Sequence, residues 1–188
     1  MTPIRYVVFL RGINVGGNKQ IRMEDLRRAF ESMGFEGVAT VLNSGNVLFW
    51  VKKTAEATLE QRIRDGLVQI LDQKANVLVR TGVKIEALVA SDPFMQIETT
   101  PQTRLYVTFF SGEVRSSLKV PYRSAEGDIR ILSVSPGAAF TAIELSPKRG
   151  TVDLMKVIET EFGTGVTTRN WNTVLKIRKK LEAMEGAA

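Results

Sequence analysis

The hydrophobic positions along the chain repeat with two periods, one typical of strands and one typical of amphipathic helices. Ile4–Leu10 is rich in β-branched and aromatic residues, which predicts a strand. Residues 22–33 place apolar side chains three and four positions apart, which predicts a helix, and Gly34 supplies its end. Residues 37–42 and 47–51 predict two short strands, joined as a hairpin by the turn residues between them.

A second helix is expected to begin near Thr54 or Thr58, because the four residues from Thr58 match the capping-box pattern of a helix start. Asn76–Arg80 is then expected to be a strand, and residues 83–90 a short helix. The order of strand, helix, strand, strand, helix, strand is that of a ferredoxin-like half. Residues 93–102 contain prolines and little periodicity, and we interpret them as a linker.

The second half of the chain predicts a matching order of elements. The expected elements are strands over 105–110, 128–134, 138–145 and 163–167, and helices over 112–118, 151–162 and 170–184. The prediction is therefore an α+β fold with two ferredoxin-like (βαββαβ) halves in tandem plus a C-terminal helix. The first half spans residues 1–92, the linker 93–102, and the second half, with the C-terminal helix, 103–188.

Several predicted strands are apolar on both faces. In the first strand, Tyr6 and Val8 alternate with Val7 and Phe9. The two helices of a βαββαβ unit cover only one face of its sheet, so the other face must pack against another layer. Either the second half of the chain or a second copy of the protein would supply that cover.

The amino-acid composition excludes several types of catalytic and metal site, whereas it is compatible with many folds. The 188 residues are 44% hydrophobic and 24% charged, as in an ordinary folded protein. Cysteine and histidine are both absent, which excludes disulfides, thiolate and Ser-His-Asp nucleophiles, and His-ligated zinc. The chain has no apolar run of the ~18–20 residues that a membrane span needs, and no secretion signal, so we expect a cytoplasmic protein without a membrane partner.

The segment Phe9–Lys19 carries the most informative polar pattern. An apolar strand runs into three glycines, two asparagines and two cations, and a helix follows. Glycine lets backbone N–H groups turn toward an anion, and a helix start adds partial positive charge. The spacing fits neither a Walker loop nor a dinucleotide fingerprint. We predict an anion site that includes Arg11, Asn14 and Lys19; the alternative is a structural crossover whose asparagines cap the backbone.

The turn over residues 43–46 is a second polar block. Asn43, Ser44 and Asn46 offer donors and acceptors that suit a base, a sugar or an amide. The same residue types also favour hairpin turns, because they tolerate a left-handed backbone. Both interpretations stay open for Asn43 and Ser44.

Residues 167–172 form a third polar block at the expected start of the last helix. Asn170 or Thr168 is a candidate cap for that helix. Arg169 is expected in its first turn, where the helix dipole disfavours a cation, so an anionic partner would explain it. Trp171 would either stack on a base or, more commonly for a tryptophan, pack in the core.

Three segments together resemble the signature of a known family. They are Leu10-Arg11-Gly12-Ile13-Asn14-Val15-Gly16-Gly17, Asn43-Ser44-Gly45-Asn46-Val47, and Thr167-Thr168-Arg169-Asn170-Trp171-Asn172-Thr173-Val174. The resemblance is to an uncharacterised, mainly bacterial family, catalogued as domain of unknown function sixteen-ninety-seven. It implies a small α/β protein of two ferredoxin-like halves, and it implies no activity.

The sequence favours binding of a phosphate-bearing small molecule, such as a nucleotide, or of a nucleic acid, since the formal net charge of +6 suits an acidic partner. The predicted contacts are Arg11, Asn14, Lys19, Asn43, Ser44, Asn46, Arg169 and Asn170. Two alternatives stay open, an enzyme without histidine that acts on a phosphorylated small molecule, and a homodimeric interaction module without a ligand. No residue stands out as catalytic, and we expect no metal site and no cofactor.

Overall fold

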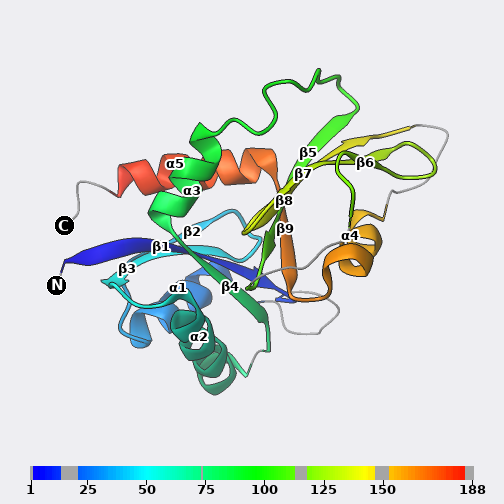
Figure 1. Ribbon diagram of the computed structural model, residues 1–188. Helices are drawn as coiled ribbons and strands as arrows, with labels where there is room; N and C mark the ends of the chain where they lie inside the picture. The colour runs from blue at the N-terminus through cyan, green and yellow to red at the C-terminus, as the bar shows by residue number, and fades with distance from the viewer. Residues whose placement is uncertain (1, 14–20, 73, 113–117, 147–152, 185–188) are drawn as a thin grey trace. The chain divides into compact units, whose positions relative to one another are not determined.

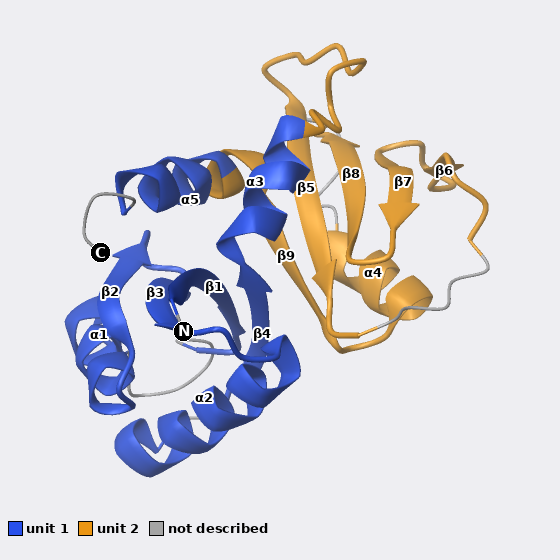
Figure 2. Cartoon of the chain, turned by 60° about the vertical axis from the view of Figure 1, so that its left-hand side comes forward, with its two compact units in different colours: residues 1–90, 175–188 blue, residues 91–174 orange. Residues whose placement is uncertain are grey.

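The computed structural model describes residues 2–13, 21–72, 74–112, 118–146 and 153–184 (Figure 1). The chain divides into two compact units, one of residues 1–90 and 175–188 and one of residues 91–174 (Figure 2). The described residues form two antiparallel sheets and five helices. The predicted mixture of helices and strands is therefore confirmed. None of the helices in these ranges is long and apolar enough to cross a membrane.

Unit 1 contains one four-stranded sheet and most of the helices. Its elements before residue 91 are β1 (Pro3–Arg11), α1 (Met23–Ser32), β2 (Glu36–Val41), β3 (Asn46–Lys52), α2 (Glu56–Leu71), β4 (Asn76–Thr81) and α3 (Gly82–Ala90). The strand order is β2-β3-β1-β4, and every neighbouring pair is antiparallel. Each strand and helix predicted for this part of the sequence is present, with boundaries that differ by a few residues.

The core of unit 1 lies between the sheet and the helices α1 and α2. Tyr6, Val8 and Leu10 alternate along β1 and point to this side. The helices contribute apolar stripes, and the phenyl rings of Phe35 and Phe49 lie 4.2 Å apart at their centres. The most completely buried helix residues of this cluster are Leu26, Phe30, Leu59, Ile63 and Leu67. The 3.6-residue spacing recognised in the sequence thus corresponds to the faces that are buried.

The predicted start of α2 at a capping box is wrong. The helix begins at Glu56, and its N-cap, Ala55, makes no side-chain cap bond. Glu60 is buried within the helix, and its Oε1 accepts a hydrogen bond of 3.0 Å from the backbone N–H of Val79. Gln61, the expected partner of Thr58 in the capping box, instead donates to Asp65 at 2.8 Å, and Glu60 serves the neighbouring strand β4.

Part of the second face of this sheet is covered by the C-terminal helix α5 (Trp171–Ala183), of which residues 175–183 belong to unit 1. Arg5 donates to the carbonyl oxygen of Leu181 at 2.8 Å and pairs with Glu86 of α3 at 3.1 Å. Its guanidinium also lies over the ring of Trp50, 5.8 Å from the ring centre. The sequence prediction assigned this whole helix to the second half, whereas residues 175–188 group with unit 1.

Unit 2 contains a five-stranded sheet with one helix on it. Its elements are β5 (Thr103–Phe110), β6 (Tyr122–Arg123), β7 (Ile129–Ser135), β8 (Ala138–Glu144), α4 (Leu154–Phe162) and β9 (Val166–Asn170). The strand order is β6-β7-β8-β5-β9, again antiparallel throughout. Apart from β6, these strands repeat the spatial order of unit 1. The helix expected over residues 112–118 lies largely outside the described residues.

We expect the substitution Tyr6→Phe to lower the free energy of unfolding by about 1–2 kcal/mol, as for the loss of a buried hydrogen-bonding group. The Tyr6 hydroxyl donates to the carbonyl oxygen of Thr54 at 2.6 Å and accepts from the N–H of the same residue at 2.9 Å. Tyr106→Phe is the matched control, because that hydroxyl makes no hydrogen bond within the described residues. Urea unfolding measures both, and equal losses would contradict the prediction.

Candidate functional site

Two of the three polar blocks lie side by side in unit 1. Phe9 near the end of β1 pairs with Asn46 at the start of β3. One residue further, the backbone N–H of Leu10 donates to the carbonyl oxygen of Gly45 at 2.8 Å. The turn over residues 42–45 therefore sits beside the end of β1, where Arg11 begins the glycine-rich segment.

A close contact through Gly45 holds this arrangement together. Gly45 has a φ of +69°, and a Cβ atom built on it would lie 2.6 Å from the Cδ1 atom of Ile13. Only glycine lets Ile13 pack this closely on the turn, where it joins the buried core cluster. Gly12 also has a positive φ, of +86°, but among the described residues no atom lies within 4 Å of its Cβ position. The backbone next to Arg11 is therefore open on that side.

Asn46 has a structural role in the turn. Its side chain is completely buried, and its Nδ2 donates to the carbonyl oxygen of Val41 at 3.0 Å and to the Ser44 hydroxyl at 2.8 Å. These bonds tie the two strands of the hairpin across the turn, in line with the structural alternative for this residue. Asn43 and Ser44 are exposed at the tip of the turn.

The remaining predicted residues of unit 1 are Arg11, Asn14 and Lys19. Arg11 is half-buried and lies opposite Asn76 of β4 in the strand register. Asn14 and Lys19 lie outside the described residues. Of the predicted contact residues, Arg11, Asn43 and Ser44 thus lie at one end of the first sheet. Their side chains are at least partly exposed to solvent.

Arg169 and Asn170 belong to unit 2. The prediction that Arg169 lies in the first turn of a helix is wrong, because it lies on β9 opposite Val107. Its Nη1 donates to the Thr167 hydroxyl at 2.9 Å and to the Thr168 carbonyl oxygen at 3.0 Å, so the helix dipole does not require an anionic partner for it. The predicted cap by Asn170 is confirmed, because its Oδ1 accepts from the N–H of Asn172 at 2.9 Å.

Trp171 packs against aromatic side chains of its own unit. Its ring meets Phe94 edge to face, with centres 5.1 Å apart, and Phe94 meets Phe140 in the same manner at 5.9 Å. This geometry is typical of packed aromatic clusters. The packing alternative therefore describes Trp171 better than base stacking does.

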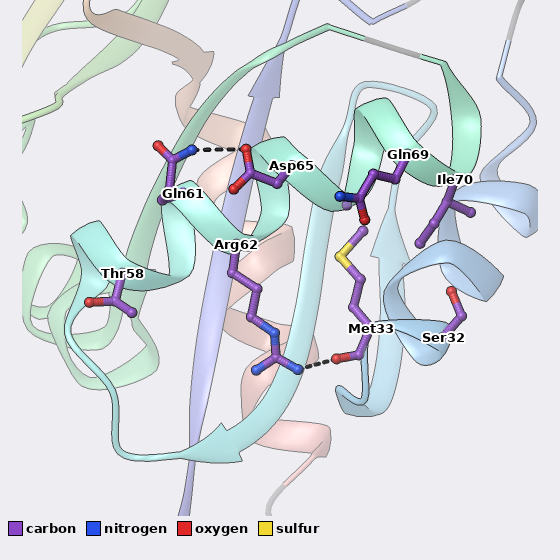
Figure 3. A pocket seen from close by; sticks show the side chains of 9 residues that line it. Ser32, Met33, Thr58, Gln61, Arg62, Asp65, Gln69 and Ile70 are labelled. Carbon is purple, nitrogen blue, oxygen red and sulfur yellow. Dashed lines mark hydrogen bonds between the residues drawn. The ribbon is translucent and has the colours of Figure 1, made fainter.

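Sequence reasoning missed a groove between α1 and α2, with a volume of about 740 Å³ (Figure 3). Its polar side chains bond to each other and to the backbone. Arg62 donates to the carbonyl oxygen of Met33 and lies over the ring of Phe35, and Gln61 donates to Asp65 at 2.8 Å. The bond from Arg62 to the Met33 carbonyl oxygen joins α2 to the end of α1, so this side chain has a structural role in the groove. No signal in the sequence pointed to it.

A second groove, of about 540 Å³, lies where α2 and α3 begin. Lys84 lies 2.9 Å from the Glu56 carboxylate, and Arg80 lies 3.5 Å from it. Burial lowers the pKa of Arg80 from its usual value, while Glu56 and Glu60 act in the opposite direction. The Glu56 carboxylate in this groove is therefore balanced by the cations next to it. Within the described ranges, no group of three or more acidic side chains is arranged to hold a metal ion.

Comparison with known proteins adds a family and a related fold. The family model described as "Protein of unknown function (DUF1697)" matches residues 4–132. The chain belongs to this family. It also resembles a solved structure, the conserved bacterial protein SP0830 from Streptococcus pneumoniae, with 20% sequence identity and a TM-score of 0.65 over 96% of this chain and 99% of that one. At this identity the likeness concerns the fold. A comparison with curated proteins yields no match.

We expect Asn46→Ala to lower the free energy of unfolding by about 1–3 kcal/mol, because it leaves the buried Val41 carbonyl without a side-chain donor. Asn43→Ala should change stability by less than about 0.5 kcal/mol, because that side chain is exposed. Thermal and urea unfolding of both variants measure the difference. A large loss from Asn43→Ala would assign that residue to the hairpin and remove it from the candidate site.

Proposed function

We propose that this protein binds a phosphate-bearing ligand, a nucleotide or a nucleic acid, at the end of β1 in unit 1. The observation that carries the proposal is the contact between the end of β1, where the glycine-rich segment begins, and the 42–45 turn, made through the Leu10–Gly45 hydrogen bond. It brings a cation, an open glycine backbone and two exposed polar side chains to the same end of the sheet.

Each of these groups suits an anionic ligand with a neutral part. Arg11 supplies a guanidinium, whose planar array of donors matches the oxygens of a phosphate. The open side of Gly12 lets a ligand approach the backbone closely. Asn43 and Ser44 offer both donors and acceptors, which suits a sugar or a base. Asn14 and Lys19 stay in the proposal on sequence grounds alone.

The proposal does not need Asn46 or Asn170 as ligand contacts, because their bonds inside the fold account for them. Arg169 donates to Thr167 and Thr168, and its guanidinium has the planar array of donors that suits the oxygens of a phosphate. We therefore keep Arg169 as a second candidate cation and test it separately from Arg11.

We also propose that each unit is a ferredoxin-like half. The support is that the second, third, first and fourth strands of each half lie in that spatial order, β2-β3-β1-β4 in unit 1 and β7-β8-β5-β9 in unit 2. In unit 1 the two helices of the βαββαβ pattern pack on the same face of the sheet. In unit 2, α4 occupies the place of the second helix.

A thermal-shift experiment tests the ligand proposal. We expect inorganic phosphate, adenosine nucleotides or short single-stranded RNA to raise the melting temperature by about 5–10 °C at a hundredfold excess over the dissociation constant. Arg11→Ala should weaken that binding about 10- to 100-fold, as for the loss of a charge-assisted hydrogen bond. Each shift is measured from the melting temperature of the same variant without ligand.

The matched control is Arg28→Ala, which removes the same charge from the exposed surface of α1. Arg169→Ala is the second arm: weakened binding would extend the site to unit 2, and unchanged binding would restrict it to unit 1. A steep dependence of affinity on salt distinguishes a nucleic acid from a small phosphorylated ligand. The absence of any shift with all three probes, or equal effects of Arg11→Ala and Arg28→Ala, would overturn the proposal.

A further inference from the structure

The strand β4 lies at one edge of the first sheet, with β1 as its neighbour within that sheet. Along an edge strand, every second residue points its N–H group away from the neighbouring strand. Val79 and Thr81 are two residues apart, and both donate their N–H groups to side chains rather than to β1. Val79 donates to Glu60 Oε1 at 3.0 Å, and Thr81 donates to Glu56 Oε1 at 3.1 Å.

The distance between the two carboxylates is similar to the distance between the two N–H groups that donate to them. Glu56 and Glu60 are four residues apart on α2, which corresponds to a rise of about 6 Å along the helix. The two N–H groups that they accept from are two residues apart on an antiparallel strand, a distance of about 6.8 Å. The helix and the strand run side by side in unit 1 (Figure 1). Residues four positions apart on α2 therefore lie opposite residues two positions apart on β4.

Two cations hold this arrangement in place. The Glu56 carboxylate contacts Lys84 at 2.9 Å and Arg80 at 3.5 Å, and Arg80 also interacts electrostatically with Glu60. Only 7% of the surface of Glu60 is exposed. Burying a carboxylate is unfavourable unless hydrogen bonds and an opposite charge compensate it, and both are present. Hydrogen bonds and ion pairs thus fix both carboxylates at the edge of β4.

The other edge of the same sheet is formed by β2, which has an irregular register that hinders pairing with a further strand. The pairing of β2 with β3 shifts register between Glu36 and Ala39, and Gly37 within that shift has a φ of +56°. Such an irregularity bends an edge strand and interrupts its row of donors and acceptors. β4 has a regular register over Asn76–Thr81, and the apolar run Val-Leu-Val at its centre is the kind of segment that pairs with another strand.

We infer that Glu56 and Glu60 close the β4 edge against a second copy of this chain. With the carboxylates in place, the donors of Val79 and Thr81 are occupied, and a second β4 strand cannot use them. Without the carboxylates, the freed N–H donors of Val79 and Thr81 would let two β4 edges pair in antiparallel orientation, with the Arg80 side chain leaving the Val79 carbonyl oxygen to which it donates at 2.7 Å. This inference concerns self-association and does not depend on the proposed ligand.

The test is the oligomeric state of the double variant E56A/E60A, measured by sedimentation velocity across the micromolar range. We expect it to dimerise about 10- to 100-fold more tightly than the unchanged protein, which corresponds to freeing two hydrogen-bond donors. E56Q/E60Q keeps an acceptor oxygen at each position and should leave the oligomeric state of the protein unchanged. E24A/E31A removes the same charge from exposed positions on α1 and should also leave the oligomeric state unchanged.

Amide hydrogen exchange of the single variants provides the second readout, and it applies even when the double variant does not fold. E60A should speed exchange of the Val79 amide, and E56A should speed exchange of the Thr81 amide. In both variants the amides of Leu78 and Arg80 should keep their protection. A monomeric E56A/E60A variant, equal dimerisation of E24A/E31A, or unchanged exchange at Val79 and Thr81 would overturn the inference.

Discussion

The burial of β1 on both faces and both edges is the constraint on which the rest of unit 1 depends. The strand is paired with β3 on one side and β4 on the other, and no residue from Tyr6 to Leu10 has more than 2% of its surface exposed. Polar chemistry is therefore confined to its two ends. Arg5 at one end joins α3 and α5, and Arg11 at the other begins the glycine-rich segment.

Many polar side chains of unit 1 complete the backbone hydrogen bonding of the fold. Tyr6, Asn46 and Glu60 are buried, and each bonds to a main-chain group at least five residues away along the chain. A buried main-chain group without a partner is costly, so a small protein with short loops uses side chains to supply the missing partners. A dense polar block in a sequence therefore contains structural residues as well as candidate ligand contacts, and only the burial and the bonds of each side chain separate the two.

Family membership and the likeness to the pneumococcal protein concern architecture. A fold of this kind hosts many unrelated functions, so the argument for a ligand has to come from particular residues. In this chain the close packing of Ile13 on Gly45 positions the start of the glycine-rich segment against an exposed polar turn. The two edges of the sheet are a separate matter, since their register and their hydrogen bonds to side chains bear on the inferred barrier to self-association.

The sequence by itself determined which segments form helices and strands, because hydrophobic periodicity is a local property that needs no knowledge of neighbours. It also determined the hairpin around Gly45, and it limited the cap of the last helix to Thr168 or Asn170, since these features involve partners a few residues away. Only the tertiary structure decided that Glu60 serves β4, that Arg169 lies on a strand, and that residues 175–188 join unit 1. The partners in these cases are distant along the chain, and no local pattern encodes a contact whose free energy arises from folding as a whole.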